Sequence, residues 1–171
     1  MNIKDLKLVL INNSFEEFKK ALEDFDINEK DNYGNILHYF IGGGFSNENS
    51  KKYKEIIDLL IKKGIDINEK QVNGRNKMSP LHIAVLLSKK DFFDYLIEVG
   101  ADGNSTDGNG NNILSTAVTW WQRINDDYFI RKLIENGADV NHENNYGRSA
   151  KMGALENDGN ESIHKYFISQ I

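Results

Sequence analysis

Hydrophobic residues recur at helical spacing in four places along the chain. Each place has apolar side chains at positions i, i+3 and i+4, which form one stripe along a helix. The four triplets are Ile57, Leu60 and Ile61; Phe93, Leu96 and Ile97; Ile130, Leu133 and Ile134; and Ile163, Tyr166 and Phe167. A lysine or glutamate and then a glycine follow the first three triplets, at Gly64, Gly100 and Gly137. Glycine accepts the left-handed conformation that ends a helix, so the pattern predicts four amphipathic helices, three of them ended by glycine.

A shorter apolar segment precedes three of these helices, at 37–41, 81–87 and 113–118. Ser79 and Pro80 mark the start of the second segment. Serine is a favoured N-cap, and proline costs nothing at the first helical position, where its missing N–H has no partner. Pro80 is the only proline in the chain. The sequence therefore predicts pairs of helices, each with a short first member and a longer second one.

The pairs are copies of one repeating unit. The segment 65–68 (Ile-Asp-Ile-Asn) recurs in related form at 101–104 and 138–141, and the preceding glycines are spaced by 36 and 37 residues. A second set of glycines follows ten residues later, at Gly74, Gly110 and Gly147. About ten Asn, Asp and Gly residues separate each helix pair from the next, which predicts a projecting turn. Two glycine series in phase indicate a repeat protein.

The segment 79–84 (Ser-Pro-Leu-His-Ile-Ala) is the best match to a known motif, and with it the chain resembles the ankyrin-repeat family. The resemblance implies an all-α solenoid of about five repeats in one domain, 1–171. The expected units are an N-terminal cap 1–30, repeats 31–70, 71–106 and 107–143, and a C-terminal cap 144–171. Since the family period is about 33 residues, insertions are expected after Gly44, at 75–78 and around 121–127. The resemblance also implies that His38 and His82 form structural hydrogen bonds between adjacent turns.

Composition narrows the function. The chain has 171 residues, a formal net charge of −5 and no cysteine. The missing cysteine excludes disulfides and thiolate metal sites, and an acidic balance disfavours nucleic acid and anionic membranes as partners. No apolar run approaches the length of a membrane span, and the N-terminus lacks the features of a signal peptide. We therefore expect a cytoplasmic protein that has no membrane segment.

Few residues suggest a catalytic, metal-binding or phosphate-binding site. His142 and His164 stand apart from other metal ligands and are interpreted as solvated surface. The glycines 42–44 follow a helix and precede no Lys-Ser/Thr, so a flexible linker is favoured over a phosphate-binding loop. Segment 102–108 lacks the glycine and glutamate of a calcium loop. We expect no catalytic residue, no metal site, no cofactor and no enzymatic activity.

The best candidate binding residues are aromatic. Thr119, Trp120 and Trp121 follow the apolar face of the first helix in the third repeat. The corresponding positions in the second repeat begin with Leu86 and Leu87. In the ankyrin family these positions face a concave groove that commonly binds partners, and tryptophan is enriched at interface hot spots. The alternative is that one or both tryptophans pack under segment 123–127, with Trp120 the more available. The projecting turns would supply the other wall, with Tyr33, Arg75, Asn109, Asn111, Tyr146 and Arg148 as candidates.

The sequence thus predicts a monomeric, non-enzymatic module that binds another protein through its groove. One specific hypothesis is an immunity or inhibitor protein that neutralises a toxin or enzyme, and the net charge favours a basic one. The main alternative is an effector or adaptor that recruits a host or cellular protein. An enzyme accessory of unrecognised type and one arm of a homo-oligomer also stay open.

Overall fold

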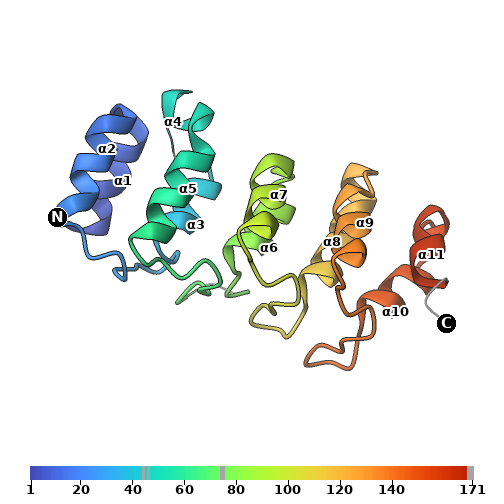
Figure 1. The fold of residues 1–171 in the computed structure, drawn as a ribbon. Helices are drawn as coiled ribbons and strands as arrows, with labels where there is room; N and C mark the ends of the chain where they lie inside the picture. Colours follow the sequence, from blue (N-terminus) through green and yellow to red (C-terminus); the bar gives the residue numbers. More distant parts are fainter. Residues whose placement is uncertain (44, 46, 74–75, 169–171) are drawn as a thin grey trace.

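A computed structural model describes residues 1–43, 45, 47–73 and 76–168. In these residues, helix pairs follow one another in a single row, joined by projecting turns that all lie on one side (Figure 1). The pairs are α1 (Ile3–Asn12) with α2 (Phe15–Ala21), α3 (Ile36–Ile41) with α5 (Tyr53–Lys62), α6 (Pro80–Leu86) with α7 (Lys90–Glu98), α8 (Ile113–Ile124) with α9 (Tyr128–Glu135), and α10 (Ala150–Leu155) with α11 (Glu161–Ile168). A short 3-10 helix η1 (Leu22–Asp24) follows α2, and α4 (Asn47–Lys51) lies between α3 and α5. The predicted all-α solenoid is confirmed.

Side-chain caps begin the first helix of each pair. Ser79 Oγ accepts the backbone N–H of His82, and Pro80 occupies the first helical position, as predicted. Asn35, Asn112 and Ser149 cap α3, α8 and α10 in the same way. An Asn or Ser cap satisfies an N–H that the helix leaves unpaired, so these three helices begin without a proline.

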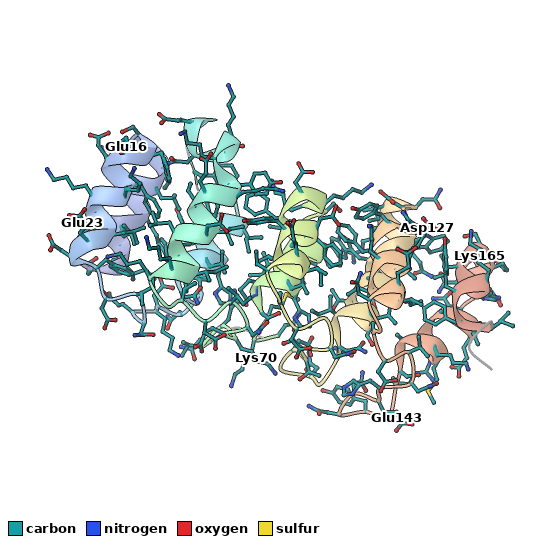
Figure 2. All side chains as sticks on the ribbon, viewed as in Figure 1. Glu16, Glu23, Lys70, Asp127, Glu143 and Lys165 are labelled. Atoms are coloured by element: carbon teal, nitrogen blue, oxygen red, sulfur yellow. The ribbon has the colours of Figure 1, made fainter. Side chains whose placement is uncertain are left out.

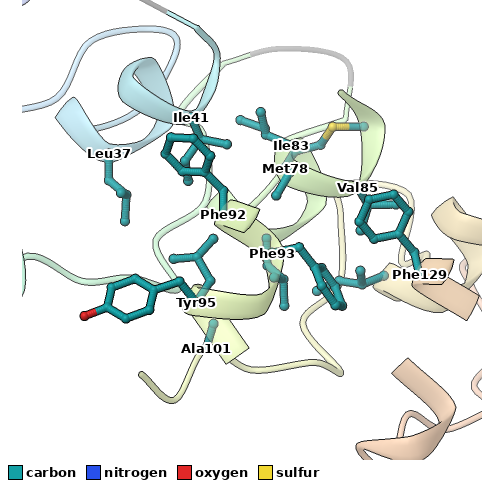
Figure 3. Packing of buried hydrophobic residues seen from close by; sticks show 14 of the residues in the cluster. Leu37, Ile41, Met78, Ile83, Val85, Phe92, Phe93, Tyr95, Ala101 and Phe129 are labelled. Carbon is teal, nitrogen blue, oxygen red and sulfur yellow. The ribbon is translucent and has the colours of Figure 1, made fainter. Parts of the chain in front are cut away.

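The hydrophobic core runs the length of the row. Helices α1, α3, α6, α8 and α10 stack on one another, and each second helix packs one face against this layer. The ring centroids of Phe40 and Phe92 lie 5.3 Å apart, edge to face. Those of Phe93 and Phe129 (both labelled in Figure 3) lie 5.1 Å apart, also edge to face, so aromatic contacts join neighbouring pairs. None of the described helices combines the length and apolar character needed to cross a membrane.

Tyrosine–aspartate hydrogen bonds join neighbouring second helices on the outer side. The hydroxyl donors and their acceptors are Tyr95 to Asp58, Tyr128 to Asp94, and Tyr166 to Asp127. The Lys165 ammonium also lies 3.9 Å from the Asp127 carboxylate (Figure 2). The hydrogen bond to Asp58 raises the pKa of Tyr95 to about 12, so this donor keeps its proton in ordinary buffers.

Helix α8 is longer than the sequence predicted. Its expected span was 113–118, with an insertion between helices around 121–127, but the helix continues to Ile124 and ends at Asn125, which is left-handed with φ +48°. The extra turn places the Trp121 ring in the core, and this burial stabilises the longer helix. The insertion expected after Gly44 contains α4, while Gly44 itself lies outside the described residues.

Replacing the buried Leu81 tests the core. We expect Leu81→Ala to lower the free energy of unfolding by ~2–5 kcal/mol, because it removes buried methyl groups and leaves a cavity. Urea denaturation followed by circular dichroism measures this. Leu87→Ala is the control, because Leu87 is 43% exposed and its truncation should change stability by less than about 1 kcal/mol. Equal losses of unfolding free energy in the two variants would contradict the assignment of Leu81 to the core.

Candidate functional site

Three hollows lie side by side along the first helices. The first, about 630 Å³, lies between α3 and α6; the second and third, about 200 Å³ each, lie between α6 and α8 and between α8 and α10. Met78 and Leu86 line both the first and the second hollow. Asn111 and Thr119 line both the second and the third. Because neighbouring hollows share lining residues, together they form one continuous groove.

The first hollow is the most apolar. Its lining includes Tyr33, Tyr39, Met78, Ile83, Leu86 and Leu87. Gly42 and Gly43 also line it, at the positions where the next repeats carry Leu86–Leu87 and Thr119–Trp120. A Cβ built on Gly43 would meet no atom within 4 Å. Gly43 thus leaves this side of the hollow open, at a position where the next two repeats carry Leu87 and Trp120.

Hydrogen bonds between successive turns stiffen one wall of the groove. The backbone N–H of Asn73 donates to Asn32 O at 3.2 Å, and that of Asn145 donates to Asn109 O at 3.0 Å. Asparagine side chains add a second set of bonds: Asn73 Nδ2 to Asn32 Oδ1 at 2.8 Å, Asn109 Nδ2 to Asn76 Oδ1 at 3.3 Å, and Asn144 Nδ2 to Asn111 Oδ1 at 2.6 Å. Amide groups engaged in this way fix the turns relative to one another.

Two buried histidines tie the turns to the helices. His38 Nε2 lies 3.2 Å from Met78 O, and His82 Nε2 lies 3.4 Å from Asn111 O, each in the next turn along the row. Burial lowers the pKa of both imidazoles to about 4, so each is neutral at neutral pH and its Nε2–H donates to the carbonyl. The structural hydrogen bonds that the family resemblance implied are confirmed.

The other two histidines, predicted to be solvated surface residues, are both half-buried. His142 Nε2 lies 2.9 Å from Gly110 O and so joins two turns. His164 is half-buried in α11. The prediction for His142 was wrong because its ring bonds to a carbonyl of the neighbouring turn. Among the described residues, no three His, Cys, Asp or Glu side chains are grouped so that they could hold a metal ion.

Most of the candidate binding residues that the structure describes lie in the groove. Its lining includes Tyr33, Leu86, Leu87, Asn111, Thr119, Trp120 and Arg148. Trp120 is half-buried, with the Arg123 guanidinium 4.5 Å from its ring centroid. Tyr33 is 71% exposed, so its ring is accessible to a partner.

Three of the candidates that the structure describes fall elsewhere. Trp121 is only 6% exposed, which corrects its assignment as a binding residue. Consecutive residues of a helix point about 100° apart, so with Trp120 on the groove the next ring turns into the core. Tyr146, 74% exposed, and Asn109 lie in the projecting turns and line none of the three hollows. Arg75 lies outside the described residues.

Tyr39, Ile83 and Met78 line the first hollow but were not among the residues predicted from the sequence. A signal was available, because aligning Gly42–Gly43 with Leu86–Leu87 shows a gap in the apolar pattern. The glycines do not form the flexible linker that the sequence predicts. In the structure Gly42 caps the end of α3, so the pair is part of the groove.

Comparison with known families identifies the fold. The sequence profile of ankyrin repeats (3 copies) matches residues 6–107 and 46–142. The chain belongs to the ankyrin-repeat family. No curated protein sequence matches it significantly. Ankyrin repeats are generally protein–protein interaction modules and are typically non-enzymatic.

The buried histidines make the stability of this ankyrin-repeat protein depend on pH. Between pH 6.5 and 4 the unfolded chain protonates His38 and His82 while the folded chain does not. Folding stability is therefore full above pH 6.5 and declines as the pH falls, by up to about 1.4 kcal/mol per pH unit for each histidine. Urea denaturation at pH values from 7 to 5 should show this decline. The double variant His38→Gln/His82→Gln should flatten the decline of unfolding free energy with falling pH, whereas His142→Gln should not. If the decline is equally steep in the double variant, His38 and His82 are not its cause.

Proposed function

We propose that this ankyrin-repeat protein binds another protein along its groove, with a segment of the partner lying against Trp120 and the first hollow. The observation that carries the proposal is the continuous groove, which presents apolar and aromatic side chains to solvent beside a wall of hydrogen-bonded turns. Exposed apolar surface of this kind gains free energy when a partner covers it. A stiff wall loses little conformational entropy on binding.

Binding of this kind supports a role as an inhibitor or immunity protein, which acts by covering a functional surface of a toxin or enzyme. The net charge of −5 favours a basic partner, because opposite charges speed the encounter. Part of this charge is carried by four exposed carboxylates that repeat along the row, Asp26, Asp66, Asp102 and Asp139. None of them lines the groove. Long-range attraction and groove contacts are therefore supplied by different parts of the surface.

Truncation of Trp120 tests groove binding. The full chain serves as bait to recover the partner from an extract of its native host, and calorimetry then measures the dissociation constant for each variant. We expect Trp120→Ala to weaken binding by about 30-fold or more, a hot-spot loss of at least ~2 kcal/mol, while helix content and the urea midpoint stay nearly unchanged. Leu8→Ala is the control, because Leu8 is 58% exposed on α1 and lines none of the hollows. Equal affinities for the wild type and Trp120→Ala would rule out binding at this ring, and a large loss of stability would assign the ring to the core.

The inhibitor role has its own test, in which the recovered partner's activity is titrated with the purified chain. We expect activity to be lost in proportion to the chain added and to end at one equivalent. A stable complex in which the partner keeps full activity would contradict inhibition and would support the adaptor alternative.

A further inference from the structure

Three lysines lie close along the chain to residues that line the first hollow, although the protein as a whole is acidic. The nearest lysines along the chain from its lining are Lys70, Lys77 and Lys89: Lys70 precedes Gln71, Lys77 precedes Met78, and Lys89 follows Leu87 by two residues. Within the described part of the chain, none of the three lysines forms an ion pair. Lys70 lies on the side of the projecting turns (Figure 2), and its ammonium donates to Thr106 Oγ1 at 3.0 Å.

The carboxylates at the same distance along the chain are already neutralised. Asp31, two residues before Tyr33, lies 2.5 Å from the Lys7 ammonium. Glu69, two residues before Gln71, lies 2.9 Å from the Lys30 ammonium. Among the charged residues within two positions of the lining, the carboxylates are therefore in ion pairs and the three lysines are not, in a chain whose net charge is −5.

The hollow itself has room for a large apolar side chain. Gly42 and Gly43, just after the last residue of α3, present no side chains to it; Tyr39 and Ile83 contribute apolar lining, and Leu87 remains 43% exposed beside it. The second and third hollows are smaller, and polar side chains such as Asn111, Ser115 and Thr119 line both of them. The first hollow is thus the place in the groove where an apolar anchor gains the most from burial.

We infer that the first hollow accepts one large apolar side chain from a partner segment in which Asp or Glu residues flank that side chain. The inference rests on the proposed function and specifies the chemistry of the segment that the groove selects. Burial of the apolar side chain supplies affinity, and the lysines favour acidic flanks over basic ones. The segment that enters the groove therefore has the opposite charge preference to the one that the net charge suggests for the whole partner.

Selection from a random 12-residue peptide library displayed on phage, with the immobilised full chain as target, tests this inference. We expect the enriched peptides to carry Phe, Leu, Met or Trp with Asp or Glu within a few residues. Fluorescence anisotropy of the best peptide then gives its dissociation constant for each variant. Leu87→Lys should weaken binding tenfold or more, and Lys77→Glu/Lys89→Glu at least fivefold.

Two matched controls separate these effects from general changes in surface charge and folding. Leu8→Lys makes the same substitution at an exposed leucine of α1, and Lys20→Glu/Lys62→Glu makes the same double charge reversal at exposed lysines outside the groove. Both controls should bind the peptide like the wild type. The thermal midpoint of every variant is measured alongside to show that it is folded.

The possible failures can be told apart. Basic-flanked peptides that still depend on Leu87 and Trp120 would overturn the inference and leave groove binding intact. Acidic-flanked peptides that bind the double lysine variant as tightly as the wild type would also overturn it. If no peptide is enriched, or if neither Leu87→Lys nor Trp120→Ala changes the dissociation constant of the best peptide, the inference and the assignment of the groove as the binding site both fail.

Discussion

The structure depends on the burial of each first helix between its two neighbours. A single helix pair cannot cover its own apolar surface, so α6 is buried only because α3 and α8 lie on either side of it. The edge-to-face contact of Phe93 with Phe129 joins the second helices of neighbouring pairs in the same way. Every other feature of the molecule, including the alignment of its turns and the groove, follows from this stacking.

Once the helices stack, the turns come close enough to bond to one another. The neutral imidazoles of His38 and His82 donate to carbonyls of the following turns, and asparagine amides bridge the turns farther out. These bonds explain the abundance of Asn in the turns, where it both forms the turn and links it to the next. The groove therefore has a wall fixed by the fold, while the side chains facing it can differ from repeat to repeat.

The net charge of this repeat protein and the charges beside its groove favour different partners. The net charge of −5 predicts attraction to basic partners. Next to the lining of the first hollow along the chain, Lys7 and Lys30 pair with the carboxylates of Asp31 and Glu69, whereas Lys70, Lys77 and Lys89 are in none of the ion pairs of the described residues. Attraction at long range reflects the whole surface, whereas contacts in the groove depend on the few charges beside it.

The sequence alone determined the repeat, the helix pairs and the Ser79–Pro80 start of α6, because these depend on spacing and capping within one unit. The structural role of His82, whose ring bonds to Asn111 in the next unit, was implied by the resemblance to the ankyrin-repeat family. Only the tertiary structure decided that Trp120 faces the groove and Trp121 the core, and that α8 extends to Ile124. The physical reason is that the exposure of a side chain depends on what the neighbouring repeat places opposite it. That residue is more than thirty positions away in the chain, and no local pattern identifies it.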